Sequence, residues 1–193
     1  GCQLIVSHHP VIFKKLSRMS RRDLPFRMIK KNISALCAHT NLDAAEGGVN
    51  DILSRLFEIH DAKPFAEDGI GRIGSVETID TCALAQKCRD ILDADSVKYV
   101  DVGHPIQQLA VVSGSGGSMW QDAAEAGADA LLTGEASHHD ALDAKRMGLS
   151  LIAAGHFATE IPIVPVLADQ LSRNFPSVRV ICSRRNKEPF TYI

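Results

Sequence analysis

Gly1-Cys2-Gln3-Leu4-Ile5-Val6-Ser7-His8-His9 can be laid over a second stretch of the same chain, Gly127-Ala128-Asp129-Ala130-Leu131-Leu132-Thr133-Gly134-Glu135. Each stretch is a short apolar run that ends in polar residues, which is typical of a buried strand. In both copies a helical stretch follows (residues 15–31 and 138–147), then an apolar strand and a His-x3-acid pair that opens another helix. The sequence therefore predicts two pseudo-repeated α/β halves.

The alternation of strands and helices determines the expected architecture. Strands joined through helices pair in parallel with right-handed crossovers, and such sheets bind ligands beyond the carboxyl ends of their strands. We expect an α/β fold with mainly parallel strands, in which a first half (residues 1–60) and a second half (75–193) are joined by a connector rich in Gly and Pro (61–74). The second copy follows a strand, a turn and a helix that the first copy lacks, so the first half is expected to be truncated at its N-terminus.

Periodicity and turn residues predict further elements in the second half. Strands are expected near residues 73–79, 96–100 and 108–112, and helices over residues 81–92, 119–126 and 163–173. A last strand is expected over residues 177–183.

Histidines and carboxylates recur where the predicted strands end. They are His8, His9, His39, Asp43, His156 and Glu160. Residues four apart in a helix lie on one face, about a turn apart, as two ligands of one metal ion require. Imidazole and carboxylate suit zinc, manganese, iron or nickel, and no cysteine is expected near these motifs. Six such groups indicate two metal ions bridged by a carboxylate. The alternative is that each histidine caps a strand or binds a backbone carbonyl.

The composition is that of an ordinary globular protein. The chain has 193 residues, 45% of them hydrophobic, and a formal net charge of -2. Its five cysteines are odd in number and lack C-x-x-C spacing, which argues against a disulfide framework and a zinc ribbon. No apolar run is long enough for a membrane span and no leader precedes Leu4, so we expect a cytoplasmic protein without membrane contact.

Two other stretches each have two interpretations. Eight basic residues crowd residues 14–31 against a single acid, Asp23, as in a solvated helix face or, alternatively, a contact with phosphate or nucleic acid. The turn Gly114-Ser115-Gly116-Gly117-Ser118 is either a tight connection or an anion cradle at the start of a helix. It lacks the Gly-Lys-Ser/Thr ending of a P-loop, which disfavours nucleoside triphosphate binding of that kind.

Five blocks occur along the chain in a fixed order. They are Ser7-His8-His9-Pro10, His39-Thr40-Asn41-Leu42-Asp43, Thr133-Gly134-Glu135, His138-His139-Asp140-Ala141 and Gly155-His156-Phe157-Ala158-Thr159-Glu160. Together they resemble the NGG-interacting-factor-three-like family, whose bacterial members are often called GTP cyclohydrolase I type 2 homologues. The resemblance covers essentially the whole chain, in the short form without an inserted domain, and the family's usual N-terminal segment is missing.

The resemblance implies an α/β subunit that assembles as a homo-hexameric toroid, with a dinuclear metal centre facing the interior. The family's metal ligands carry over to His8, His9, Asp43, His156 and Glu160. His39 is either a ligand or a neighbour of the ligands. Glu135 and His139 match motif positions near the centre and are expected to orient a ligand or to act as general base or acid.

Five protein ligands shared by two ions leave coordination positions for water, which favours a metal-dependent hydrolase. The family label implies GTP or another purine nucleotide as the substrate, opened by hydrolysis, although phosphate-ester or amide hydrolysis would need the same metals. The alternatives are a non-catalytic metal-binding scaffold and a ring that binds nucleic acid or a partner protein.

Overall fold

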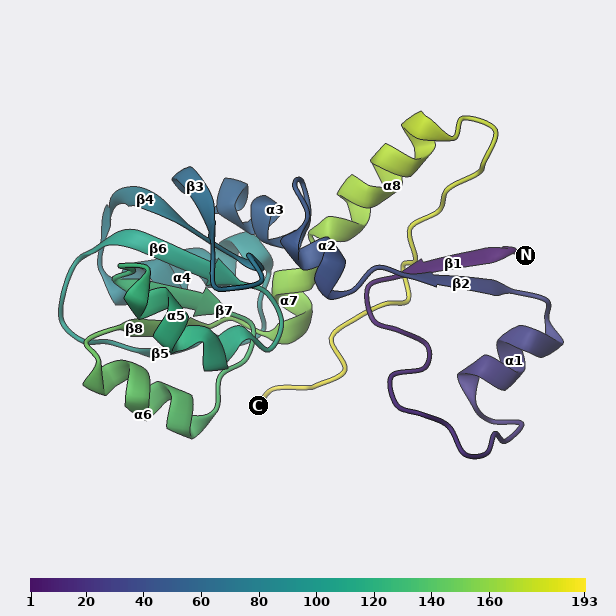
Figure 1. The fold of residues 1–193 in the computed structure, drawn as a ribbon, viewed down its shortest axis with the longest axis horizontal. Coiled ribbons are helices and arrows are strands. Elements are labelled where there is room, and N and C mark those ends of the chain that lie inside the picture. Colours follow the sequence, from purple (N-terminus) through teal and green to yellow (C-terminus); the bar gives the residue numbers. More distant parts are fainter. The chain divides into compact units, whose positions relative to one another are not determined.

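The computed structural model describes residues 1–193, and the chain divides into two compact units, Gly1–Asp43 and Ala44–Ile193 (Figure 1). Both units combine helices with strands, so the expected α/β class is confirmed. The boundary after Asp43 lies well before the connector that was expected at residues 61–74.

Unit 1 contains a parallel pair of strands with a helix in the connection between them. β1 (Leu4–Ser7) pairs with β2 (Ser34–Cys37), and Ser7 lies opposite Cys37. α1 (Leu24–Lys30) begins where Pro25 fits the first turn of a helix, in which its missing N–H costs no hydrogen bond. Residues 15–23, expected to be helical, are not. α2 (Thr40–Ala44) follows β2 and reaches the unit boundary.

Unit 2 is built on a six-stranded sheet with the strand order β3-β4-β6-β7-β8-β5. Its strands are β3 (His60–Phe65), β4 (Gly71–Ile79), β5 (Lys98–Val100), β6 (Ile106–Val112), β7 (Ala130–Thr133) and β8 (Ser150–Ala153). β6, β7 and β8 pair in parallel, whereas the pairs β3 with β4, β4 with β6, and β5 with β8 are antiparallel. The sheet is thus mixed, where mainly parallel strands were expected.

Most of the segment expected as a connector belongs to this sheet, as the hairpin of β3 and β4. Pro64 lies on β3 opposite Arg72. β3 is an edge strand, and proline is tolerated there because the outer side of the strand has no ladder partner. The Gly and Pro residues of this segment therefore mark an edge strand and a tight turn rather than a linker.

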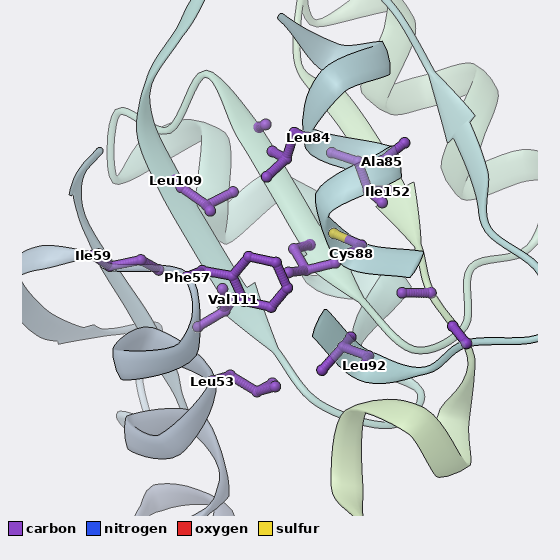
Figure 2. Packing of buried hydrophobic residues seen from close by; sticks show 14 of the residues in the cluster. Leu53, Phe57, Ile59, Leu84, Ala85, Cys88, Leu92, Leu109, Val111 and Ile152 are labelled. Carbon is purple, nitrogen blue, oxygen red and sulfur yellow. The ribbon is translucent and has the colours of Figure 1, made fainter. Parts of the chain in front are cut away.

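Helices cover both faces of the six-stranded sheet. On one face lie α3 (Val49–Leu56) and α4 (Thr81–Leu92), and on the other lie the short 3-10 helix η1 (Gly116–Met119), α5 (Trp120–Glu125) and α6 (His138–Arg146). α7 (His156–Glu160) and α8 (Ile163–Asn174) follow β8, and of α8 only Ile163 is buried. Side chains alternate across a strand, so Leu109 and Val111 of β6 join the cluster beneath α3 and α4. Ala110 and Val112 join the cluster beneath α5 and α6. Figure 2 shows the first cluster, with Phe57, the residue after α3, at its centre.

The best-predicted helix is α4, which covers residues 81–92 as expected. Asp80 caps it by accepting a hydrogen bond from the N–H of Ala83 at 2.8 Å. α8 is also found where expected, but residues 177–183 form no strand. None of the helices has the length and apolarity needed to cross a membrane.

Candidate metal centre

Three imidazoles gather where the strands of unit 1 end. β1 and β2 are parallel and in register, so the residues that follow Ser7 and Cys37 emerge at the same edge. The ring of His8 lies 5.1 Å from those of His9 and His39, and the rings of His9 and His39 lie 5.4 Å apart, between centroids. Each ring offers a nitrogen within 4.8 Å of the other two. The structure therefore groups His39 with His8 and His9, two of the three predicted ligands of this unit.

The ring orientation of His8 is fixed through Nδ1. This nitrogen lies 2.8 Å from the carbonyl oxygen of Ala38, and since a carbonyl only accepts, Nδ1 carries the proton. Its other nitrogen, Nε2, lies 3.5 Å from Oδ1 of Asp43. A backbone carbonyl that fixes the tautomer of the ring is a usual feature of metal-binding histidines.

Cys37 lies closer to these histidines than expected. Its Sγ donates to the carbonyl oxygen of His8 at 2.9 Å, so the prediction that no cysteine lies near the motifs is wrong. The parallel pairing is the reason, because it sets the end of β2 beside the residue that follows β1. The thiol is turned toward a carbonyl, and the group of potential ligand atoms at this edge consists of imidazoles.

In unit 2, three parallel strands end at the same level. Val112 of β6 pairs with Thr133 of β7, and Thr133 pairs with Ala153 of β8. The ladder continues past the strands, because the N–H of Glu135 donates to the carbonyl of Gly114 at 2.8 Å. The glycine-rich turn after β6, the end of β7 and the start of α7 therefore lie side by side.

His156 is the first residue of α7 and contacts groups from all three of these segments. Its Nε2 is 2.9 Å from Oε1 of Glu160, one helical turn later. Its Nδ1 is 3.0 Å from Oε2 of Glu135 and 3.3 Å from Oγ of Ser115. The Ser115 hydroxyl also donates to Oε2 of Glu135, at 2.5 Å. The sequence did not identify Ser115, whose single signal was its place in the glycine-rich turn.

These contacts shift the pKa values of His156 and Glu135. The hydrogen bond to Glu160 is the largest cause that raises the pKa of His156, to about 9; partial burial opposes it and Glu135 adds to it. The pKa of Glu135 is held below its ordinary value by the hydrogen bonds with His156 and then Ser115. At neutral pH an imidazolium thus lies between two carboxylates, an arrangement in which a divalent cation can replace the proton.

The spacing of the donor atoms fits a divalent metal ion. Bonds of about 2.0–2.2 Å place two ligands of one ion about 3–3.5 Å apart. Nε2 of His156 and Oε1 of Glu160 are 2.9 Å apart, and Nε2 of His8 and Oδ1 of Asp43 are 3.5 Å apart. Each unit therefore carries one imidazole–carboxylate pair with the spacing of a metal site.

Gly114 provides the space beside the pair in unit 2. A Cβ at this position would lie 2.5 Å from Oε1 of Glu160 and 3.3 Å from Nε2 of His156. The N–H of Gly114 donates to Oγ1 of Thr159, and that of Gly117 to the carbonyl of Glu135. Because these N–H groups are used inside the protein, the structure favours a tight turn over an anion cradle.

His139 lies outside the hydrogen-bonded cluster around His156. It is exposed in the first turn of α6, where Ser137 and Asp140 form a capping box, and its ring centroid is 6.0 Å from that of His138. Of the two residues expected to assist the centre, Glu135 contacts a candidate ligand and His139 does not.

Comparisons with known proteins identify the family. The family model described as Duf34/NIF3 (NGG1p interacting factor 3) matches residues 1–189. A protein of Clostridium perfringens named GTP cyclohydrolase 1 type 2 homolog is 32% identical in an alignment 206 residues long. The alignment covers 100% of this chain and 79% of the relative. NGG1-interacting factor 3 of Saccharomyces cerevisiae is 34% identical over 185 residues, covering 83% of this chain and 64% of the relative.

A solved structure agrees with these matches. The crystal structure of the Staphylococcus aureus hypothetical protein SA1388 superposes with a TM-score of 0.87 at 26% identity, covering 99% of this chain and 80% of that one. The chain belongs to the Duf34/NIF3 family.

Proposed function

We propose that this protein is a metal-dependent hydrolase with two divalent metal ions per subunit. The proposed ligands are His8, His9, Asp43, His156 and Glu160. The observation that carries the proposal is the setting of His156, whose Nδ1 binds Glu135 while Nε2 lies 2.9 Å from Glu160. Histidines that bind metals are commonly held in this way by a carboxylate on the second nitrogen. Zinc, iron, manganese and nickel all suit the ligand types.

The number of proposed ligands supports a centre that is open to water and substrate. Unit 2 supplies the pair His156 and Glu160, which is fewer than the four ligands of a closed structural zinc site. With His8, His9 and Asp43 the total is five for two ions, so positions remain for water and substrate. A centre with such positions favours catalysis over a purely structural role.

Two bound divalent ions would lower the pKa of a water molecule and polarise a substrate oxygen. The side chains of this chain then have separate tasks. His156 and Glu160 would bind a metal ion, and Glu135 orients the imidazole of His156 through its hydrogen bond with Nδ1. A general-base role for Glu135 would require it to release hydrogen bonds to both His156 and Ser115. We propose Glu135 or His139 for proton transfer, and of the two it is Glu135 that contacts a proposed ligand.

The names of the relatives support a purine nucleotide as the substrate, with GTP the first compound to test. The protein loaded with zinc or manganese should be incubated with GTP, with ATP and with a simple phosphate ester, and the products followed by mass spectrometry. We expect hydrolysis of at least one of them and its loss in His156→Ala. Absence of any turnover in a fully loaded protein would instead favour the non-catalytic scaffold.

Metal affinity is expected to depend on pH through His156. With a pKa of about 9, this imidazole is protonated in the metal-free protein at neutral pH, so an incoming ion must displace a proton. The apparent affinity should therefore fall about tenfold for each pH unit below about 9. Titration of the metal-free protein with zinc between pH 6 and 8 checks the slope. An affinity independent of pH would contradict the assignment of His156 as a ligand.

The proposal includes assembly as a homo-hexamer, which rests on the family resemblance. Unit 1 also exposes large apolar side chains, among them Ile12, Phe13 and Ile29, which are 51%, 72% and 72% exposed. Groups of such side chains commonly mark surfaces that bind other proteins. Analytical ultracentrifugation should show a species of six subunits, and a monomer at all concentrations would contradict this part of the proposal.

A further inference from the structure

We infer that Ser115 is a positioning residue, which holds Glu135 in place so that Glu135 can present His156 to a metal ion. The inference rests on the proposed metal centre and adds a residue outside its ligand set. Ser115 acts through Glu135 and contacts no proposed substrate.

The hydrogen bonds meet on one carboxylate oxygen. Oε2 of Glu135 accepts from the Ser115 hydroxyl at 2.5 Å and lies 3.0 Å from Nδ1 of His156. The side chain of Glu135 is 51% exposed, so without a second partner it would be free to sample several rotamers. Fixing a long exposed side chain costs conformational entropy. The hydroxyl of Ser115 offsets this cost by selecting the rotamer that reaches His156.

Backbone hydrogen bonds place the Ser115 hydroxyl beside the carboxylate of Glu135. Before Ser115, the carbonyl of Gly114 accepts a hydrogen bond from the N–H of Glu135 at 2.8 Å. After Ser115, the N–H of Gly117 donates to the carbonyl of Glu135 at 3.0 Å. The close approach requires glycine, because a Cβ on Gly117 would lie 2.5 Å from Cα of Ala136. The turn is thus tied to Glu135 through its backbone as well as through the Ser115 side chain.

The geometry argues against Ser115 as a nucleophile. In a Ser-His-acid triad the serine and the acid bind opposite nitrogens of the imidazole. Here Ser115 and Glu135 both lie at Nδ1 of His156, while Nε2 lies at Glu160. The serine therefore supports the orientation of the ring and is not activated by it.

Zinc affinity of the full chain, measured by chelator competition, tests the inference. Ser115→Ala should bind zinc about tenfold more weakly than the wild type, as expected for the loss of a supporting hydrogen bond. Ser115→Thr keeps the hydroxyl and should restore the affinity. Ser118→Ala is the matched control, since Ser118 is exposed in the same turn and should have no effect. An affinity of Ser115→Ala within twofold of the wild type would overturn the inference.

A second measurement separates this inference from the proposed function. In a crystal structure of metal-free Ser115→Ala, Glu135 should have left His156, with a separation well beyond the 3.0 Å of the wild type. If Glu135 stays at that distance, the inference is wrong whether or not the protein binds metal. If the wild type binds no zinc, the proposed function fails. The role of Ser115 is then decided by the distance between Glu135 and His156 in the Ser115→Ala crystal structure.

Discussion

Gly114→Ala is expected to weaken the binding of divalent metal by about 100-fold or more, the upper end of the effects seen when support for a ligand is lost. The new Cβ would lie 2.5 Å from Oε1 of Glu160, so this carboxylate would have to leave the position that it shares with His156. Gly114 also has a φ of +60°, a conformation that strains alanine. Zinc titration of the purified variant measures the loss.

Gly127→Ala is the matched control for this variant. Gly127 also has a positive φ, +88°, but a Cβ there would meet no atom within 4 Å. Both variants should lose about 1 kcal/mol or more of stability from backbone strain. Gly114→Ala alone should lose metal. Wild-type affinity in Gly114→Ala would show that Glu160 is not a ligand, and equal loss in both variants would assign the effect to backbone strain.

Arg72→Met is expected to lower the free energy of unfolding by about 3–5 kcal/mol, the cost of breaking a buried ion pair on one side. Arg72 is 4% exposed, and its Nε lies 2.5 Å from Oδ1 of Asp51. Its remaining N–H groups donate to the carbonyls of Ala44 and Gly69, at 2.7 Å and 2.8 Å. The variant removes the arginine donor from Oδ1 of Asp51 and from these carbonyls. Urea unfolding followed by circular dichroism measures the change.

Arg146→Met is the control for the buried arginine. Arg146 pairs with Asp143 at 3.0 Å, but the two side chains are 75% and 44% exposed. Exposed pairs of this kind contribute little, so the change in stability should stay below about 1 kcal/mol. If Arg72→Met were no more destabilising than this control, the buried network around Arg72 would have no role in holding unit 2 together.

Local signals explain which elements could be predicted from the sequence. The helical period of its apolar residues predicts α4 over its full length, and the structure adds the cap by Asp80. Residues 15–23 were predicted as helix, but the helix begins only at Leu24, beside Pro25. Residues 177–183 have the composition of a strand but no neighbour to pair with, and pairing depends on parts of the chain far away in sequence.

The candidate site could be predicted where its geometry is local. The contact of His156 with Glu160 follows from their spacing in one helix. The contacts of Ser115 with Glu135 and of Cys37 with His8 join segments that are 20 and 29 residues apart, and they depend on the register of parallel strands. No local pattern marks such a partner. The pseudo-repeat and the dinuclear metal centre stay predictions.

Metal content per subunit tests the dinuclear centre most directly. Wild-type protein, His8→Ala and His156→Ala should each be stripped with a chelator, reloaded, dialysed and measured by elemental mass spectrometry. We expect about two ions per subunit in the wild type and fewer in both variants, since each removes a ligand from a different unit. A wild type that remains metal-free after reloading, or His156→Ala at full occupancy, would contradict the account.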